Sequence, residues 1–263
     1  MTPAPSSALS GAHALVTGAS GGIGGAIALA LAAAGARVSI AGRKPAALAS
    51  LADRLGSAMG TQASFDITDE AAVGEAIAAI RVAAGPLDIL INNAGNARSA
   101  SFERTDAPLW SEMLAVNLTG SFLVTRAVAG EMLARRAGRI VNIASTAGLS
   151  GYPYVSAYVA AKHGLVGLTR ALALEFARKG VTVNAVCPGY TDTPMLDAAI
   201  AGIAAKTGRG EEDARATLAA ANPSGRLVTP QEVADAVLWL VSPGAAAVTG
   251  QAIVVAGGEV MAG

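Results

Sequence analysis

The sequence predicts an α/β domain with a doubly wound, parallel sheet that helices cover on both faces. Short β-branched runs alternate with longer Ala- and Leu-rich helical patterns along nearly all of the 263 residues. Hydrophobic residues make up 52% of the chain and charged residues 14%, so a large core is easily filled. Aromatic residues are only 4%, which leaves that core to Ala, Val, Leu and Ile, as is typical of parallel strands buried on both faces.

Each predicted strand is a β-branched run, and predicted helices fill most of the gaps between strands. Such alternation makes parallel strands joined by right-handed crossovers. We expect strands at 12–17, 36–41, 62–66, 87–92, 138–144, 181–187 and 251–256. We expect helices at 23–34, 45–56, 69–83, 107–136, 156–179, 211–221 and 230–241. No repeat, low-complexity tract or linker divides the chain, so residues 1–263 are predicted to form a single domain.

Two segments fall outside this alternation. Residues 1–10, MTPAPSSALS, are expected to be a flexible leader. Residues 190–228 hold several prolines and glycines around short helical pieces, between a predicted strand and the last helix. Open α/β sheets bind ligands just beyond the carboxyl ends of their strands. We therefore interpret 190–228 as a substrate lid, with an ordinary surface excursion as the alternative.

Charge and cysteine content exclude several classes of protein. The formal net charge is zero, whereas a nucleic-acid binder needs a basic surface to neutralise phosphates. Cys187 is the only cysteine, so neither a disulfide framework nor a thiolate metal cluster is expected. The stretch before Arg37 carries no charge, but it lacks the basic start of a signal peptide and glycines interrupt it. We expect a cytoplasmic protein with no metal site and no attachment to a membrane.

A glycine-rich turn lies directly between the first strand and the first helix, in ALVTGASGGIGGAIALALA. Gly18, Gly22 and Gly24 allow a tight turn, close approach of a pyrophosphate and tight packing of the helix on the strand. The helix N-terminus then offers unpaired N–H groups to the phosphates. Glycines alone would also fit a flexible loop, but this position in an alternating chain favours a dinucleotide site.

The end of the second strand, AGRK at 41–44, indicates the kind of dinucleotide. An acidic residue there would bind the ribose 2′-hydroxyl of NAD, and none is present. Arg43 suits the 2′-phosphate of NADP, with a merely solvated residue at a strand end as the alternative, and the absence of an acid is the stronger part of the argument. We expect NADP(H), with NAD(H) as the alternative. Asp66, which ends the third predicted strand, could bond the adenine amino group, since Asp69 is the better cap for the following helix.

Tyr158 and Lys162 lie one turn apart on an apolar predicted helix, so they share a face. A nearby ammonium and a cationic nicotinamide ring would favour the phenolate of the tyrosine, which could then exchange a proton with a ketone or alcohol oxygen. Ser145 ends a predicted strand, where its hydroxyl could hold the same oxygen. Taken alone, the pattern is more simply explained by an amphipathic helix with a packed tyrosine and a surface lysine.

Several motifs in order show that the chain resembles the classical short-chain dehydrogenases/reductases over residues 12–258. The matching motifs are TGASGGIG (17–24), NNAG (92–95), Asn117 in AVNLTG, Ser145 in NIAS, YVAAK (158–162) and PGYTDTPM (188–195). The resemblance implies a single-domain Rossmann fold with a seven-stranded parallel sheet in the order 3-2-1-4-5-6-7. It also implies a homotetramer formed through the two longest helices, 107–136 and 156–179.

The resemblance implies a role for each reactive residue. Tyr158 would donate the proton in reduction, Ser145 would polarise the carbonyl, and Lys162 would lower the pKa of the tyrosine and hold the nicotinamide ribose. Asn117 would anchor a water that passes protons from the lysine to solvent. Hydride would move between the nicotinamide and the carbonyl carbon. Regulators of this fold that only bind dinucleotides typically lose the tyrosine or the lysine, so we do not expect a non-catalytic role.

The resemblance also assigns a cofactor site, with the glycine turn on the phosphates and NNAG on the ribose. The segment after the sixth strand would hold the carboxamide. The implied contacts are Gly18, Ser20, Gly22, Ile23, Gly24, Arg43, Asp66, Ile67, Asn93, Ala94, Gly95, Tyr158, Lys162, Pro188, Gly189, Thr191 and Thr193. Two positions depart from the family pattern. Gly21 stands where NADP-preferring members often carry a second basic residue, and Ala256 replaces the aspartate of the usual VDGG tail.

The second half of the chain resembles two subgroups of the family. SAYVAAKHGLVGLTR is similar to 3-hydroxybutyrate dehydrogenases, and NIASTAG, VNAVCPG and PGAAAVTGQA are similar to ketoreductases of aromatic polyketide synthesis. The first subgroup grips a free carboxylate with polar residues, whereas Ala147, Val155 and Ala199 stand at matching positions here. An apolar pocket cannot offset the desolvation of a carboxylate, so we do not favour 3-hydroxybutyrate as the substrate.

Arg98, in NNAGNAR, matches an arginine of 3-ketoacyl carrier-protein and acetoacetyl-CoA reductases. It could meet a phosphopantetheine arm, or it could be a solvated loop cation. We therefore expect NADPH-dependent reduction of a 3-oxoacyl thioester linked to CoA or to a carrier protein. The alternatives are the reduction or oxidation of a hydrophobic cyclic or aryl ketone or alcohol, or of a hydroxy acid similar to 3-hydroxybutyrate.

Overall fold

A computed structural model describes residues 8–261 of the chain. Residues 1–7 of the predicted leader lie outside this range. Leu9, which the leader prediction also included, is buried in the core, and its N–H donates to the Ala34 carbonyl at 3.1 Å. The prediction is therefore wrong for Leu9, because its apolar side chain packs with the first strand and helix.

Seven parallel strands form one sheet in the order β3-β2-β1-β4-β5-β6-β7, which confirms the predicted topology. The strands are β1 His13–Thr17, β2 Arg37–Ala41, β3 Met59–Ala63, β4 Ile89–Asn92, β5 Gly138–Ile143, β6 Val181–Pro188 and β7 Ala252–Val255. Strands β1, β4 and β6 are buried along their whole lengths. Burial on both faces explains why their sequences are mainly apolar instead of alternating.

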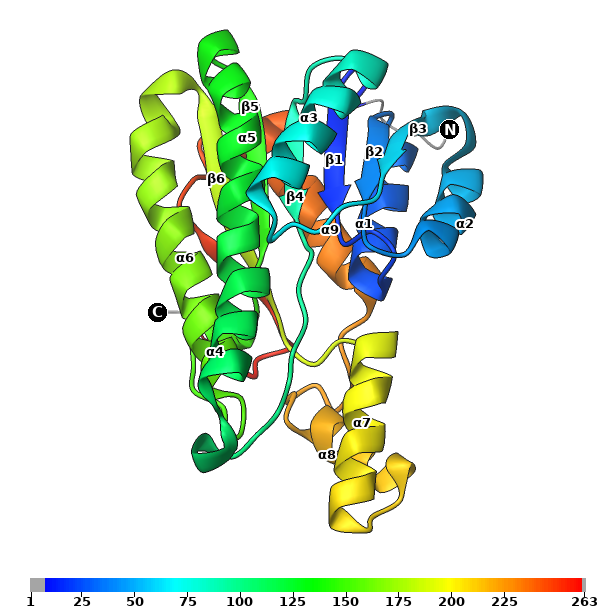
Figure 1. Ribbon diagram of the computed structural model, residues 1–263, viewed down its shortest axis with the longest axis vertical. Helices are drawn as coiled ribbons and strands as arrows, with labels where there is room; N and C mark the ends of the chain where they lie inside the picture. The colour runs from blue at the N-terminus through cyan, green and yellow to red at the C-terminus, as the bar shows by residue number, and fades with distance from the viewer. Residues whose placement is uncertain (1–7, 262–263) are drawn as a thin grey trace.

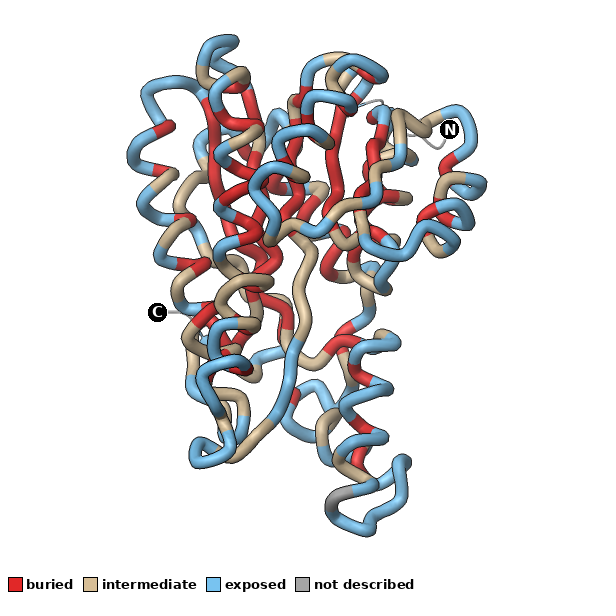
Figure 2. The backbone as a smooth tube through the Cα atoms, viewed as in Figure 1, coloured by how far each residue is buried: buried red, intermediate tan, exposed pale blue. Residues whose placement is uncertain are grey.

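Helices cover both faces of the sheet (Figure 1). One face is covered by α1 (Gly22–Ala33), α2 (Pro45–Leu55) and α9 (Pro230–Val241). The other is covered by α3 (Glu70–Ala84), α5 (Gly120–Arg135) and α6 (Ser156–Phe176). Figure 2 shows the buried segments concentrated on the strands and on the sides of the helices that face them. The sheet is thus the middle layer of a three-layer domain.

The long helix predicted at 107–136 is interrupted. It consists of α4 (Ala107–Leu114), a π-helical turn (Ala115–Thr119) and α5. The π-helical turn contains Asn117, whose side chain is buried. A π-bulge widens a helix locally and frequently lies at a functional site, and hydrophobic periodicity does not reveal it.

The third strand begins at Met59, earlier than the predicted residue 62. It lies at the edge of the sheet and is only partly buried. An edge strand buries little surface, so no hydrophobic alternation marks where it starts. Gly60 allows the strand to pair here, since a Cβ at that position would lie 2.6 Å from Ser39 Oγ.

Residues 190–228 fold mainly into two helices, α7 (Pro194–Thr207) and α8 (Glu211–Ala220). Figure 1 shows both of them beyond the carboxyl ends of the strands, away from the other helices. They pack on each other through Leu196, Ile200 and Ala214. The sequence analysis expected only short helical pieces before 211, whereas Thr193 caps a full helix that has Pro194 at its first position.

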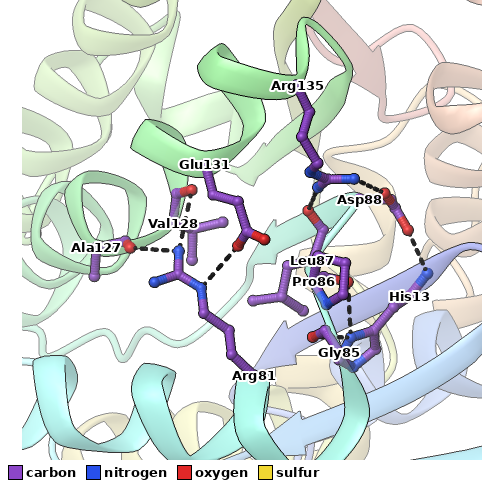
Figure 3. Close-up of polar contacts among 10 residues, drawn as sticks. All are labelled: His13, Arg81, Gly85, Pro86, Leu87, Asp88, Ala127, Val128, Glu131 and Arg135. Atoms are coloured by element: carbon purple, nitrogen blue, oxygen red, sulfur yellow. Dashed lines mark hydrogen bonds and ion pairs between the residues drawn. The ribbon is translucent and has the colours of Figure 1, made fainter.

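Polar contacts fix the opposite, amino-terminal edge of the sheet (Figure 3). Arg135 on α5 forms a 2.7 Å ion pair with Asp88, which also accepts the N–H of His13 at 2.9 Å. Arg81 on α3 pairs with Glu131 on α5 at 2.9 Å. These contacts tie α3, α5 and β1 together at the edge remote from α7 and α8, and so leave the carboxyl edge free to form a site.

Helix α6 approaches its neighbours closely through small residues. Ala161 is buried, and a Cβ at Gly164 would lie 2.8 Å from Leu118 Cδ2, so these two positions serve packing within the chain. Gly167 faces open space. By length and composition the stretch Ala107–Arg135 could cross a membrane, but half of the apolar window is buried against the rest of the chain, as in the core helix of a globular domain.

Two apolar residues on α3 test the assigned core. Ile80 is 1% exposed against the sheet, whereas Val82, on the outer face of the same helix, is 90% exposed. We expect Ile80→Ala to lower the free energy of unfolding by about 2–5 kcal/mol, because it removes buried methyl groups and leaves a cavity. Val82→Ala should change it by less than about 0.5 kcal/mol. Urea denaturation of both variants measures the difference, and equal effects would contradict the assignment.

Candidate active site

The glycine turn after β1 adopts a shape that side chains would prevent. Gly18 has a φ of +64°, and a Cβ there would lie 2.6 Å from Ala94 Cα. A Cβ at Gly24 would lie 2.5 Å from Asn93 Nδ2. Helix α1 begins at Gly22, and no side chain caps its N-terminus. The N–H groups of its first turn are therefore available to phosphate oxygens.

Thr17 and Asn93 hold this turn against the end of β4. Thr17 Oγ1 accepts the N–H groups of Asn93 and Ala94 at 3.1 and 3.2 Å. Asn93 Nδ2 donates in return to the carbonyls of Thr17 and Gly18, both at 3.0 Å. The Asn93 side chain is thus committed to the turn, which leaves Ala94 and Gly95 to line the site. Sequence analysis gave Thr17 no role, although its hydroxyl directly before the turn was a usable signal.

The segment after β6 reaches the same turn. A Cβ at Gly22 would lie 2.8 Å from Thr193 Cγ2. The hydroxyl of Thr191 donates to the Gly189 carbonyl at 2.9 Å, and Thr193 caps α7. Pro188 ends β6. Residues expected at the phosphates and residues expected at the carboxamide therefore line one continuous edge of the sheet.

The residues expected around the adenosine lie at the ends of β2 and β3. Arg43 is exposed, and no hydrogen bond or ion pair holds it within residues 8–261. Asp66 Oδ1 accepts the N–H and hydroxyl of Thr68 at 2.9 and 2.8 Å; these bonds, together with nearby Arg43, lower the pKa of Asp66. Asp69 caps α3, as expected.

Three further residues assigned to the cofactor make packing contacts in this structure. Ile67 packs against Gly120, where a Cβ would lie 2.5 Å from Ile67 Cδ1. Ile23 packs on the core beneath α1. Ser20 Oγ lies 3.3 Å from the Cβ position of Gly42, which brings the turn beside the end of β2.

Lys162 is a buried cation at the centre of the candidate site. Its side chain is 5% exposed, and Nζ donates to the Ile143 carbonyl at 2.9 Å. Nζ also lies 5.6 Å from the centroid of the Tyr158 ring. Burial lowers the pKa of Lys162 to about 8. The explanation by a surface lysine is therefore wrong for this helix.

Tyr158 is half-buried, and the Ser145 hydroxyl lies beside its phenol. Burial raises the pKa of Tyr158, and the hydroxyl of Ser145 partly offsets this by lowering it. The net direction is upward because desolvation outweighs the hydrogen bond from Ser145. A protonated phenol is the form that can donate a proton to a carbonyl oxygen.

Asn117 and Gly95 complete the centre. Asn117 Nδ2 donates to the Met113 carbonyl at 3.1 Å, and Oδ1 accepts the N–H of Asn96 at 3.3 Å. A Cβ at Gly95 would lie 2.8 Å from Asn117 Oδ1 and 3.6 Å from Lys162 Nζ. The structure thus brings together NNAG, the π-helical turn and the tyrosine–lysine pair, which are far apart in the sequence.

A buried polar network lies in the sheet beneath this centre, and sequence analysis missed it. Asn92 Nδ2 donates to Thr125 Oγ1 at 2.8 Å and to Asn142 Oδ1 at 2.9 Å. Asn142 Nδ2 donates to Thr169 Oγ1 at 2.8 Å. The network joins β4 and β5 to α5 and α6. Asparagines inside otherwise apolar strands were the available signal, since buried amides need partners.

Two other features limit the chemistry of the site. Arg98 forms an exposed 2.6 Å ion pair with Glu112 on α4. Within the described residues, no group of three or more His, Cys, Asp or Glu side chains is placed to hold a metal ion. The polar side-chain groups gathered at the centre are the phenol of Tyr158, the hydroxyl of Ser145 and the ammonium of Lys162.

Comparisons with known proteins agree with this geometry. The short chain dehydrogenase family model matches residues 12–203. A putative ketoacyl reductase of Streptomyces coelicolor is 44% identical over 250 residues, which cover 93% of this chain and 95% of that protein. The 3-oxoacyl-acyl-carrier-protein reductase FabG of Escherichia coli is 39% identical over 251 residues, which cover 95% of this chain and 98% of that protein.

A solved structure is similar along the same length. The crystal structure of a variant of actinorhodin polyketide ketoreductase with NADPH superposes with a TM-score of 0.91 at 42% sequence identity. The match covers 94% of this chain and 97% of that one. The sheet order, the arrangement of the candidate site and these matches together show that the chain belongs to the short-chain dehydrogenase/reductase family of oxidoreductases.

Proposed function

We propose that the chain is an NADPH-dependent reductase of a 3-oxoacyl thioester carried by CoA or a carrier protein. The observation that carries the proposal is the grouping of the half-buried Ser145 and Tyr158 with the buried Lys162 at the end of the glycine-lined edge of the sheet. Relatives named ketoacyl reductase and 3-oxoacyl-acyl-carrier-protein reductase support the substrate class.

The residues present fit a nicotinamide dinucleotide along this edge. The positions of Gly18, Gly22 and Gly24 leave no room for side chains, and the uncapped start of α1 can take the pyrophosphate. We assign the 2′-phosphate to Arg43, which is exposed and forms no hydrogen bond or ion pair within the described chain, although Asp66 lies near enough to interact with its charge. When bound, the cofactor supplies the hydride for the carbonyl carbon.

The side chains of the centre supply the proton and hold the carbonyl. Tyr158 donates its phenolic proton to the carbonyl oxygen, and the Ser145 hydroxyl donates a hydrogen bond to that oxygen. Burial keeps the phenol protonated until reaction, since it raises the pKa of Tyr158. The Lys162 ammonium, next to the ring, stabilises the phenolate as it forms and holds the nicotinamide ribose. We assign to Asn117 a water that returns a proton through Lys162.

The surroundings favour a neutral, apolar substrate body. Ala147, two residues after Ser145, is buried and apolar. Val155, the residue before α6, is also apolar. Arg98 is paired with Glu112 at an exposed position, from which a phosphopantetheine phosphate could compete for it. The similarity to polyketide ketoreductases favours the second candidate, a cyclic or aryl ketone.

We extend the proposal to the surroundings of the site. Helices α7 and α8 act as a substrate lid, because they pack on each other beyond the carboxyl edge. The chain assembles as a cytoplasmic homotetramer through α5 and α6, whose Phe122 and Leu174 expose apolar surface at 42% and 84%.

The reductase proposal predicts that Tyr158→Phe abolishes turnover but retains the cofactor. We expect the rate of NADPH oxidation with acetoacetyl-CoA to fall at least about 100-fold, because the variant has no proton donor at the carbonyl. NADPH binding, measured by the change in its fluorescence, should persist. The matched control is Tyr154→Phe, since Tyr154 is 68% exposed and should tolerate the change.

Unchanged turnover in Tyr158→Phe would contradict the proton-transfer mechanism. Turnover of a bulky cyclic ketone without turnover of acetoacetyl-CoA would show that the substrate is a cyclic or aryl ketone and not a thioester. NADPH binding without turnover of any ketone by the unaltered chain would indicate a regulator instead of an enzyme.

The assignment of Arg43 predicts a change in cofactor preference. We expect Arg43→Gln to raise the KM for NADPH by about tenfold or more, because charge-assisted bonds to the 2′-phosphate are worth roughly 1.5–3 kcal/mol. The KM for NADH should hardly change. Arg54→Gln, which removes an exposed arginine from α2, is the control. Equal effects of Arg43→Gln on both cofactors would refute the assignment.

The buried Lys162 predicts a pH-dependent difference in stability. With the folded-state pKa lowered to about 8, the folded chain binds fewer protons than the unfolded chain between pH 8 and the ordinary lysine pKa of ~10.4. Stability of the unaltered chain relative to Lys162→Met should therefore rise with pH in this window and be constant below it. Chemical denaturation across pH measures the difference, with exposed Lys179→Met as the control. A difference that is constant across the window would contradict the assignment.

A further inference from the structure

The short turn that follows β7, residues 256–260, contacts both sides of the proposed substrate site. We name it the C-terminal turn. It closes with a hydrogen bond from the Glu259 N–H to the Ala256 carbonyl at 3.1 Å. Gly257 lies against Asn222, at the end of the lid segment, and Gly258 lies against Pro223. Strand β7 also accepts the Gly189 N–H through Val255, at 3.0 Å. A segment remote in sequence is thus fixed next to the substrate.

Glu259 carries the only charge of this turn and points it inward. Its Oε1 accepts the hydroxyl of Tyr152 at 2.5 Å. Its Oε2 is buried and accepts no hydrogen bond. Among the described residues no lysine or arginine forms an ion pair with Glu259. Glu259 is thus a partly buried acid: one oxygen is held by Tyr152, the other is covered, and no cation pairs with it within the described residues.

The position of Oε2 places this charge near the reacting end of the proposed site. A Cβ at Gly189 would lie 2.5 Å from Oε2, so the oxygen rests on the backbone assigned to the carboxamide end of the cofactor. The substrate carbonyl must lie between that end and Tyr158. The charge of Glu259 also reaches Tyr190, whose pKa burial raises and this charge raises further.

Two tyrosines connect Glu259 to both walls of the site. Tyr152 lies in the segment between Ser145 and α6, and its hydroxyl also contacts the Thr146 side chain. Tyr190 packs with the apolar cluster of the lid. The two rings meet edge to face, with centroids 6.3 Å apart and an interplanar angle of 86°. Glu259 thus holds one member of an aromatic pair that spans from the Ser145 segment to the lid.

We propose that Glu259 is a specificity-determining residue that rejects free keto acids and so reserves the site for neutral keto esters and thioesters. The inference rests on the proposed function. A substrate carboxylate next to the covered Oε2 of Glu259, which has neither a hydrogen-bond donor nor a cation, meets like-charge repulsion, and it also loses its hydration. A neutral ester of the same acid meets neither penalty. Discrimination of this kind arises from an unfavourable interaction with the rejected substrate, here the free keto acid.

The test compares acetoacetate with its ethyl ester as substrates for purified, NADPH-loaded protein. The quantity measured is the ratio of kcat/KM for the ester to kcat/KM for the acid. Glu259→Gln keeps an acceptor for Tyr152 but removes the charge, and we expect it to lower this ratio by about tenfold, mainly through a smaller KM for acetoacetate. Glu75→Gln, which removes an exposed carboxylate from α3, should leave the ratio unchanged.

Two further variants separate charge from structure. Tyr152→Phe removes the hydroxyl but leaves the carboxylate, so the ratio should stay high. Glu259→Met provides a second neutral side chain of similar length if Glu259→Gln does not fold. An unchanged ratio in a folded neutral variant that still reduces the ester would overturn the inference while the proposed function stands. Failure of the unaltered chain to reduce the ester or acetoacetyl-CoA would overturn the proposed function itself.

Discussion

The contact between the ends of β1 and β4 is the constraint on which the candidate site depends. The two backbones approach so closely that a Cβ at Gly18 would collide with Ala94. Asn93 donates two hydrogen bonds to Thr17 across the gap, from its backbone N–H and from its side-chain amide, and the parallel pairing of Val16 with Ile91 continues directly into them. The phosphate end of the site is therefore positioned by the register of the sheet. A flexible loop without these contacts could not fix the position of the N-terminus of α1.

At the other end of the site, a buried cation lies above a buried polar network. The ammonium of Lys162 is buried with one backbone acceptor, which makes it costly to keep charged. The amide network of Asn92 and Asn142 lies beneath it and is joined to α5 and α6 through threonine hydroxyls. Asn92 Oδ1 has no partner within the described residues, but the other hydrogen bonds of the network connect β4 and β5 to α5 and α6. They fix the helix that carries Tyr158 relative to the strand that leads to Ser145.

The walls around the substrate come from segments that are far apart along the chain. Tyr152 follows the fifth strand, Tyr190 follows the sixth, and Glu259 follows the seventh. In a parallel sheet these segments emerge at one edge, so each can be altered without disturbing the sheet. Specificity can therefore vary on a constant catalytic centre. In this chain the segment after the seventh strand carries the carboxylate of Glu259.

The sequence by itself determined the alternation of strands and helices, the glycine turn and the cap at Asp69, because hydrophobic period, glycine spacing and residue type are local signatures. The order of the strands and the candidate reactive residues came from the resemblance of the motifs to a family. Only the tertiary structure decided what depends on burial and on contacts between distant segments. It showed that Asn117 lies in a π-helical turn, that Asn93 braces the turn, and that burial raises the pKa of Tyr158. It also placed Glu259 against Tyr152. The sequence could not predict these features, because desolvation and contacts between distant segments leave no periodic pattern in it.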